Sequence, residues 1–312
     1  MHEENRNRRH DEGRTLSRRD VLLVSAQAAT ALALARCGGG SIGSYAPAAA
    51  LSPSDAPPYA VKDDVHAVDG AGTDHALDPL GHTLTRVNAD GTVEWQQVGG
   101  PLNGPSQAAF DRQGRTYVAN VGGHDVPVFD ADGRHVQTIG GYGGDAGRFN
   151  HPTDVLVDAQ DRLYVCDTLN HRVQVLDTDG QAQLAIGVPG TEPGALNGPK
   201  ALATDPEGYL HVVDAGNARV QVFDAGGRYV DTYGRYGTDT GQFVMPRDIA
   251  IDAYGRSYVV DSGRGVIVVF ERSGAEAAGF FQPELPGGEK VMPLRVSLDA
   301  QGELVVTGHP IA

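Results

Sequence analysis

The sequence predicts an all-β protein built from six copies of one structural unit. Three observations support this prediction: the glycine content, a set of positions that recurs at a fixed spacing, and four short apolar segments in each copy. Glycine accounts for 42 of the 312 residues, roughly twice its usual share of about 7%, and no Gly-X-Y period accompanies it. This composition favours many tight turns between short strands over long helices.

The recurring positions are spaced by 47 residues. One class consists of Pro105, Pro152, Pro199, Pro246 and Pro293. Another consists of Asp111, Asp158, Asp205, Asp252 and Asp299. An earlier copy lies 42 residues upstream of the second one, where Asp69 matches Asp111. Six repeats are therefore predicted, with starts near residues 63, 105, 152, 199, 246 and 293.

Each repeat divides into four predicted strands. In the third copy these are residues 154–158, 162–167, 172–176 and 182–186, separated by Asp-, Asn- and Gly-rich turns. A repeat of about 40–47 residues with four strands is typical of one propeller blade. The sequence therefore predicts a six-bladed β-propeller over residues 59–312. The copy that starts near 293 supplies only two strands, and residues 59–62 are the one nearby candidate for a further strand.

The amino-terminal residues 1–36 are predicted to be an export signal. A basic segment with Arg18 and Arg19 precedes the weakly apolar run 21–35, and residues 17–23 resemble the twin-arginine motif. Cys37 and the Gly/Ser residues after it are similar to a lipoprotein box, although Arg36 stands where a small residue is usual. An ordinary signal peptidase would instead cleave after residues 33–35 or 48–50.

Several expectations about location follow from this segment. Residues 37–58 are rich in Gly, Ser, Ala and Pro, and we expect them to be a flexible linker. The protein is expected in the periplasm, attached to the membrane only through a lipid at Cys37. No run reaches the roughly 18 apolar residues of a membrane-spanning helix.

Two segments resemble the NHL repeat. These are residues 167–176 (DTLNHRVQVL) and 214–223 (DAGNARVQVF), and the resemblance extends over residues 63–312. It implies a six-bladed propeller whose ligand surface is the face with the connections into the first strands. It does not imply one activity, because the fold occurs in lyases, RNA-binding proteins and interaction modules.

No metal or other cofactor is predicted. His82, His124 and His171 recur in consecutive repeats, but histidines at one position per blade would lie too far apart to share a metal at about 2 Å. The NHL-like amidating lyases have zinc-binding histidines directly after the blade proline. Here that position holds Ser106, Thr153, Lys200, Arg247 and Leu294. The recurring aspartates, such as Asp167 and Asp214, are predicted to cap backbone N–H groups of the loop that follows them.

The candidate ligand site lies at the mouth of the central channel. The charged and amide residues one or two positions after the prolines are Gln107, Asp154, Lys200, Arg247, Asp248 and Arg295. Three cations that converge on a protein with a formal charge of −15 would attract an anion or a carboxylate. Alternatively, Asp154 and Asp248 pair with these cations and leave no free charge.

The sequence favours a monomeric, non-enzymatic binding module that binds a protein partner or a small anionic ligand through the channel mouth. The alternative is a propeller enzyme, a lyase or a lactonase-like hydrolase, with its site at the same mouth. The sequence shows no axial His or Glu cluster for such chemistry, so no catalytic residue is predicted. Nucleic acid is not expected as a partner, because phosphate contacts need positive charge.

Overall fold

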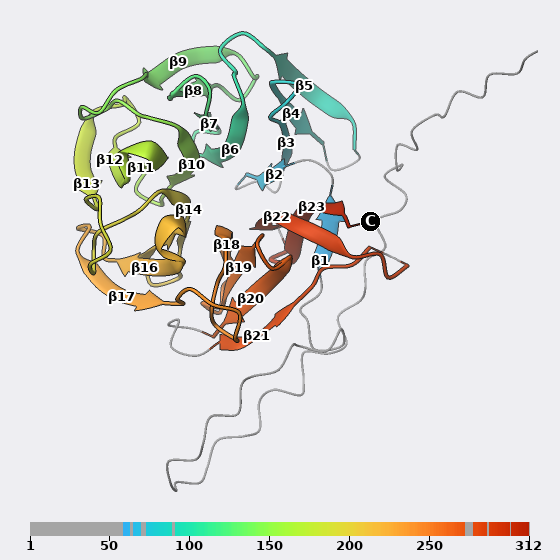
Figure 1. The fold of residues 1–312 in the computed structure, drawn as a ribbon. Helices are drawn as coiled ribbons and strands as arrows, with labels where there is room; N and C mark the ends of the chain where they lie inside the picture. The colour runs from blue at the N-terminus through green and yellow to red at the C-terminus, as the bar shows by residue number, and fades with distance from the viewer. Residues whose placement is uncertain are drawn as a thin grey trace, which may run out of the picture.

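The computed structural model describes residues 59–62, 65–69, 73–88, 91–271, 277–285, 287–299 and 301–311. Six sheets surround a central axis and form a six-bladed β-propeller (Figure 1). Helical structure in the described residues consists of two 3-10 turns, η2 (Thr168–Asn170) and η3 (Ala215–Asn217). The predicted export signal, Cys37 and the linker all lie outside the described residues.

Five of the six sheets have four strands, and the sixth has three. Blade 1 contains β2 (Val65–Val68), β3 (Asp74–Asp78), β4 (Thr83–Val87) and β5 (Val93–Val98). Blade 2 contains β6 (Pro105–Phe110), β7 (Thr116–Asn120), β8 (Asp125–Phe129) and β9 (His135–Gly140). Blade 3 contains β10 (Pro152–Val157), β11 (Leu163–Asp167), β12 (Arg172–Leu176) and β13 (Ala182–Ile186). Blade 4 contains β14 (Pro199–Thr204), β15 (Leu210–Asp214), β16 (Arg219–Phe223) and β17 (Tyr229–Tyr233). Blade 5 contains β18 (Pro246–Ile251), β19 (Ser257–Asp261), β20 (Val266–Phe270) and β21 (Ala277–Phe281). Blade 6 contains β22 (Val291–Leu298), β23 (Leu304–Pro310) and β1 (Tyr59–Lys62).

The recurring prolines open the inner strands of four blades. β6, β10, β14 and β18 each begin at one of them, which suits a residue that cannot donate a backbone hydrogen bond to the ladder. A register shift follows each of these prolines, as between Pro152 and Val155. In blade 6 the corresponding Pro293 lies inside β22, and the shift falls between Pro293 and Arg295.

The sixth blade is completed by the amino-terminal strand. β1 pairs with β23 in parallel, from Tyr59 opposite Leu304 to Lys62 opposite Thr307. The Tyr59 ring stacks on Phe281 of blade 5 at a centroid distance of 5.3 Å. The two ends of the described chain thus meet in one sheet and close the ring (Figure 1).

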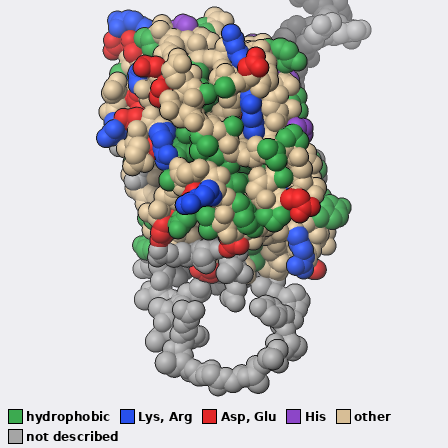
Figure 2. Space-filling model, turned by 90° about the vertical axis from the view of Figure 1, so that its left-hand side faces the viewer, with side chains coloured by type: hydrophobic (Ala, Val, Ile, Leu, Met, Phe, Trp, Pro, Cys, Tyr) green, Lys and Arg blue, Asp and Glu red, His purple; other side chains and the backbone are tan. Residues whose placement is uncertain are grey.

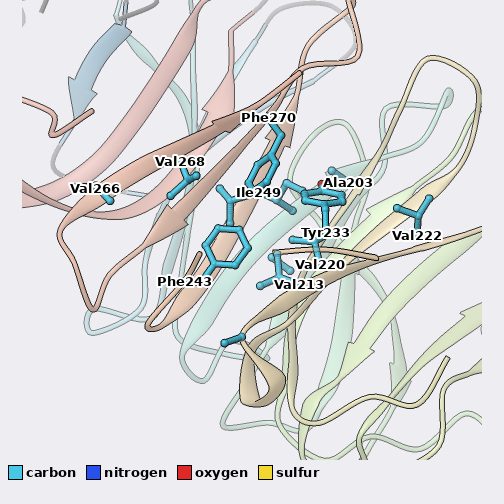
Figure 3. Packing of buried hydrophobic residues seen from close by; sticks show 13 residues of the cluster. Ala203, Val213, Val220, Val222, Tyr233, Phe243, Ile249, Val266, Val268 and Phe270 are labelled. Carbon is cyan, nitrogen blue, oxygen red and sulfur yellow. The ribbon is translucent and has the colours of Figure 1, made fainter. Parts of the chain in front are cut away.

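The core lies between neighbouring blades. Figure 3 shows one such interface, where Val213 and Val220 of blade 4 pack with Ile249 and Phe270 of blade 5 around Phe243. All residues of β7, β11, β15 and β19 are buried, because adjacent blades cover both faces of the second strand. At the edge of the disc beside β13, basic and acidic side chains are interspersed (Figure 2).

Candidate functional site

The beginnings of the inner strands define one face of the propeller, which we call the mouth face. Because the strands of a blade are antiparallel, the connections between second and third strands lie at the same face. At this face, side chains directly after the proline form hydrogen bonds to the inner strand of the next blade. Ser106 Oγ donates a hydrogen bond to the carbonyl of Thr153 (2.8 Å), and Thr153 Oγ1 donates to the carbonyl of Lys200 (2.9 Å).

Asp154 and Asp248 occupy the next position along their inner strands, and each is only 2% exposed. Asp154 Oδ2 accepts the N–H of Leu202 in the next blade (2.6 Å), and its Oδ1 accepts the N–H of Val155 (2.8 Å). Asp248 Oδ2 accepts the N–H of Val296 in the next blade (2.9 Å). Both carboxylates therefore bridge neighbouring inner strands next to the register shifts.

Burial changes the protonation of these carboxyls. Burial, followed by the charge of Asp248, raises the pKa of Asp154 to about 8, against the opposing effect of Arg295. Burial also raises the pKa of Asp248, and the nearby Arg295 opposes it. Arg295 Nη1 lies 3.8 Å from Asp248 Oδ1. The raised pKa of Asp154 disfavours its ionised form, so this residue offers less negative charge to the cations of the mouth than an exposed aspartate would.

Lys200 and Arg247 differ from Arg295 in having no directly paired carboxylate among the described residues, although the charge of Asp248 acts on Arg247. Within the ranges that the structure describes, neither side chain makes a hydrogen bond or an ion pair. Burial, then the charge of Arg247, lowers the pKa of Lys200. Burial, then the charge of Arg295, lowers the pKa of Arg247. The structure thus brings the three cations close enough to repel one another, and it pairs one of them with a carboxylate.

A cavity of about 320 Å³ occupies part of the channel beneath the mouth. Gln107 and Asp154 line its polar side. Gln107 Oε1 accepts the N–H of Ala108 (3.2 Å). Phe110, Val157 and Leu298 line it further along the inner strands. Of the six predicted site residues, Gln107 and Asp154 thus line the cavity, Asp248 bridges two blades, and the three cations lie outside its lining.

His151 belongs to the same region, although the sequence reasoning missed it. Its ring lies 4.9 Å from that of His124, which in turn lies 5.1 Å from the ring of Tyr142. Burial, then the charges of His124 and Lys200, lowers its pKa. The available signal was its place directly before Pro152, where two other repeats have glycine.

The recurring histidines connect consecutive blades. His82, His124 and His171 have φ values of 53°, 57° and 57°. Their Nδ1 atoms accept backbone N–H groups of the next connection, from Gly104 (2.8 Å), His151 (3.0 Å) and Gly198 (3.0 Å). The described part of the chain contains no group of three or more His, Cys, Asp or Glu residues placed to hold a metal ion.

The prediction that the recurring aspartates cap their own loops is wrong for Asp167 and Asp214. Neither caps the 3-10 turn that follows it. Asp167 Oδ1 instead accepts the N–H of Asn150 in the preceding connection (2.7 Å), and its Oδ2 lies 2.8 Å from Arg172 Nε. Asp78 does accept N–H groups of its own loop, from Leu80 and Gly81. The difference arises because the N–H groups that correspond to that of Leu80 have other acceptors: Leu169 N–H donates to the Asn150 carbonyl (3.0 Å) and Gly216 N–H to the Asn197 carbonyl (2.8 Å).

Comparisons with known proteins agree with this architecture. Residues 149–176 match the NHL repeat family. A streptogramin B lyase structure has a TM-score of 0.59 at 12% identity, over 77% of this chain and 74% of that one. A gluconolactonase from Xanthomonas campestris has a TM-score of 0.59 at 22% identity, over 80% and 84% of the two chains. A virginiamycin B lyase from Staphylococcus aureus has a TM-score of 0.58 at 13% identity, over 78% and 76%.

The chain is thus a six-bladed β-propeller that contains an NHL repeat. No curated protein sequence matches it. None of the helices in the described residues is long and apolar enough to cross a membrane.

Proposed function

We propose that this propeller is a non-enzymatic binding module that takes an anionic ligand at its mouth face. The observation that supports this most is the state of Lys200 and Arg247. Lys200 is half-buried and Arg247 is exposed beside Arg295, and neither forms a direct ion pair within the described chain. Like charges that lie close together disfavour one another, and an anion would relieve this repulsion through charge-assisted hydrogen bonds.

Exposed apolar side chains on the same face support this proposal. Tyr142 is 72% exposed, Tyr236 is 74% exposed and Met245 is 59% exposed. Tyr142 and Tyr236 occupy equivalent positions in two connections that lead to inner strands, and Met245 directly precedes β18. Aromatic residues and methionine are enriched in binding surfaces, so the residues around the mouth suit contact with a ligand or partner.

The test is a double variant, Lys200→Ala with Arg247→Ala. We expect titration calorimetry with acetate, phosphate and citrate to detect binding to the wild type and none to the variant. The melting temperature should not fall, because the two removed charges repel their neighbours. Arg112→Ala is the matched control, since Arg112 is 70% exposed and pairs with Asp161 away from the mouth. Unchanged anion binding in the double variant, or a large fall in its melting temperature, would contradict the proposal.

An enzyme remains the second candidate function. Its support is Asp154 at the wall of the cavity, because a carboxyl with a raised pKa can act as a general acid. A gluconolactonase and streptogramin lyases share the fold, so glucono-lactone and streptogramin B are suitable first substrates. Turnover by the wild type that Asp154→Asn abolishes, without loss of folding, would favour the enzyme.

We also propose export by the twin-arginine route and lipid attachment at Cys37, on the sequence pattern of residues 17–41. Replacing Arg18 and Arg19 by lysine should leave precursor in the cytoplasm. Cys37→Ser should release the exported protein from the membrane fraction. Continued export of the lysine variant, or continued membrane attachment of the serine variant, would contradict the respective assignment.

A further inference from the structure

His151 has an unusual backbone conformation on the mouth face. It directly precedes Pro152, the first residue of β10, and its φ is +55°. Blades 2 and 4 have glycine at the same place, Gly104 with a φ of +66° and Gly198 with a φ of +59°. This left-handed conformation is unfavourable for a residue with a Cβ, whereas glycine adopts it readily. The chain therefore has an imidazole at a strained position where two of its own repeats have no side chain.

Burial in the core does not explain this histidine. His151 is an exposed residue, and its ring meets that of His124 at 4.9 Å with the two planes 68° apart. Its backbone N–H donates to His124 Nδ1 (3.0 Å), but a glycine makes the same bond in the next blade, where Gly198 N–H donates to His171 Nδ1 (3.0 Å). The connection therefore needs the backbone of residue 151 and not its imidazole.

The imidazole lies near the cations of the mouth. Thr153, two residues further along the chain, donates through Oγ1 to the carbonyl of Lys200 (2.9 Å), so the start of β10 lies directly against the start of β14. Partial burial, then the charges of His124 and Lys200, lowers the pKa of His151. Nearby positive charge disfavours the protonated imidazole, so the side chain is opposed by its neighbours as well as by its backbone.

No carboxylate among the described residues compensates this charge. His124 faces His151 from the connection between β7 and β8, and its Nδ1 accepts the His151 N–H, so the neutral His124 ring carries its proton on Nε2. Asp125, the acidic residue next to His124, accepts a hydrogen bond from an asparagine amide (2.6 Å). Asp145 and Arg148 of the connection that contains His151 are not among the charges that act on its protonation. A bound anion would supply the missing negative charge.

We propose that His151 is a further residue of the anion site and that it takes up a proton when the anion binds. This inference rests on the proposed function and adds a fourth cationic group to Lys200, Arg247 and Arg295. An anion beside Lys200 offsets the charge that opposes protonation, and a protonated imidazole donates a charge-assisted hydrogen bond to it. Because this coupling is reciprocal, the mouth binds anions more tightly as the pH falls. A strained residue is typical of such a functional position.

The test is titration calorimetry of the full chain with sulfate between pH 5.5 and pH 8.5. Sulfate keeps both of its charges over this range, so a change in affinity belongs to the protein. We expect the wild type to bind sulfate about tenfold more tightly at the lower pH, the equivalent of about 1.4 kcal/mol. Binding heats measured in buffers of different ionisation enthalpy should show a net uptake of protons, largest in the range where histidine titrates.

Two variants assign the proton to His151. His151→Gly should weaken sulfate binding at pH 5.5 and remove the dependence on pH, while its melting temperature stays equal or rises, because glycine suits the positive φ. His151→Gln keeps a hydrogen-bond donor that does not titrate, so its sulfate affinity should also be independent of pH. The matched control is His135→Ala, which should keep the wild-type dependence. His135 is an exposed histidine that opens β9 at the face opposite the mouth.

The outcomes separate this inference from the proposed function. Sulfate binding that is lost in the Lys200/Arg247 double variant but has the same pH dependence in His151→Gly as in the wild type would overturn the inference and leave the proposed function in place. A clearly lower melting temperature of His151→Gly would give the imidazole a structural role and would also overturn it. Failure of sulfate to bind at any pH would overturn the inference, and failure of acetate, phosphate and citrate as well would overturn both.

Discussion

At the scale of single residues, one repeat position serves different partners in different blades. In blade 4 Asp214 is fully buried and its Oδ2 lies 2.8 Å from Arg219 Nε. In blade 2 the corresponding residues are Asn120 and Asp125, so the carboxylate is on the third strand instead of the second. There Asn120 Nδ2 donates to Asp125 Oδ1 (2.6 Å). The amide or carboxylate at the end of the second strand is thus matched to the first residue of the third strand.

This matching predicts a compensated pair of substitutions. Asp214→Asn should lower the free energy of unfolding by about 3 kcal/mol, because Arg219 is left without its carboxylate in a mostly buried place. Adding Arg219→Asp recreates the blade 2 arrangement and should recover part of this loss, a coupling of at least about 1 kcal/mol. Urea unfolding of the two single variants and the double variant measures that coupling.

The control for the Asp214 and Arg219 variants is Asp132→Ala. Asp132 has a side chain that is 68% exposed and lies in a hairpin turn, so its removal should cost less than about 0.5 kcal/mol. Strictly additive effects of the Asp214 and Arg219 substitutions would show that the two positions are not matched.

The raised pKa of Asp154 predicts how stability depends on pH. The folded-state pKa is about 8, against an unfolded value near 4. Between these values the folded protein holds a proton that the unfolded chain releases. The free energy of unfolding should therefore fall as the pH rises from about 4 to about 8, and this contribution should level off above 8.

Asp154→Asn removes this contribution, so the variant should lose less stability than the wild type between pH 5 and pH 8. Asp248 has a raised pKa as well and contributes with the same sign in both proteins, so the difference between them reports Asp154. Denaturant unfolding at pH 5, 6.5 and 8 is the measurement. Parallel pH profiles would mean that Asp154 is ionised in the folded protein throughout this range.

The sequence could place the candidate site but not its internal pairing. A proline that opens each inner strand predicts which residues come next, so the six predicted residues could be assigned to the channel mouth. Which of the cations meets a carboxylate depends on the register shifts. The shift after Pro293 sets Arg295 3.8 Å from Asp248, and nothing in the spacing of the repeats shows that distance.

At the scale of elements, the connection between blades is held by a large apolar side chain under the end of the outer strand. Phe149, Leu196 and Phe243 recur with a spacing of 47 residues and are fully buried. They lie against Gly140, Gly187 and Gly234, respectively. Two independent features require glycine at position 234. Its φ is +78°, and a Cβ there would overlap the ring of Phe243.

Two glycine substitutions separate these requirements. Gly208 also has a positive φ, +86°, but a Cβ there would meet no atom within 4 Å. Gly208→Ala should therefore cost only the conformational strain, about 1 kcal/mol. Gly234→Ala adds a clash in the core and should cost about 3 kcal/mol. Thermal or urea unfolding of both variants tests this, and equal losses would mean that the ring of Phe243 moves aside freely.

At the scale of the whole molecule, the fold was predictable because each repeat is a copy of one unit and six such units close a disc. Residues 59–62 could be named from the sequence as the candidate for a further strand, but their pairing with β23 could not, since β1 has no counterpart in the repeats. It is parallel to β23, whereas the neighbouring strands within the other five blades are antiparallel. Only the three-dimensional proximity of the two ends brings this pair together.

The closure predicts how the ring responds to shortening. A chain that begins at residue 63 lacks β1, so the backbone of β23 is left as an open edge that can pair with other chains. It also loses the Tyr59 ring on Phe281 and the Tyr59 hydroxyl that accepts the N–H of Glu284 (2.8 Å). We expect a free energy of unfolding lower by at least about 3 kcal/mol and aggregation on warming, relative to a control chain that begins at residue 58. Tyr59→Phe keeps the strand and the stacked ring but removes the acceptor of the Glu284 N–H, so it should lose only about 1 kcal/mol. If both shortened chains melt at the same temperature, the ring is closed by the contacts of β22 with its neighbours and β1 is dispensable.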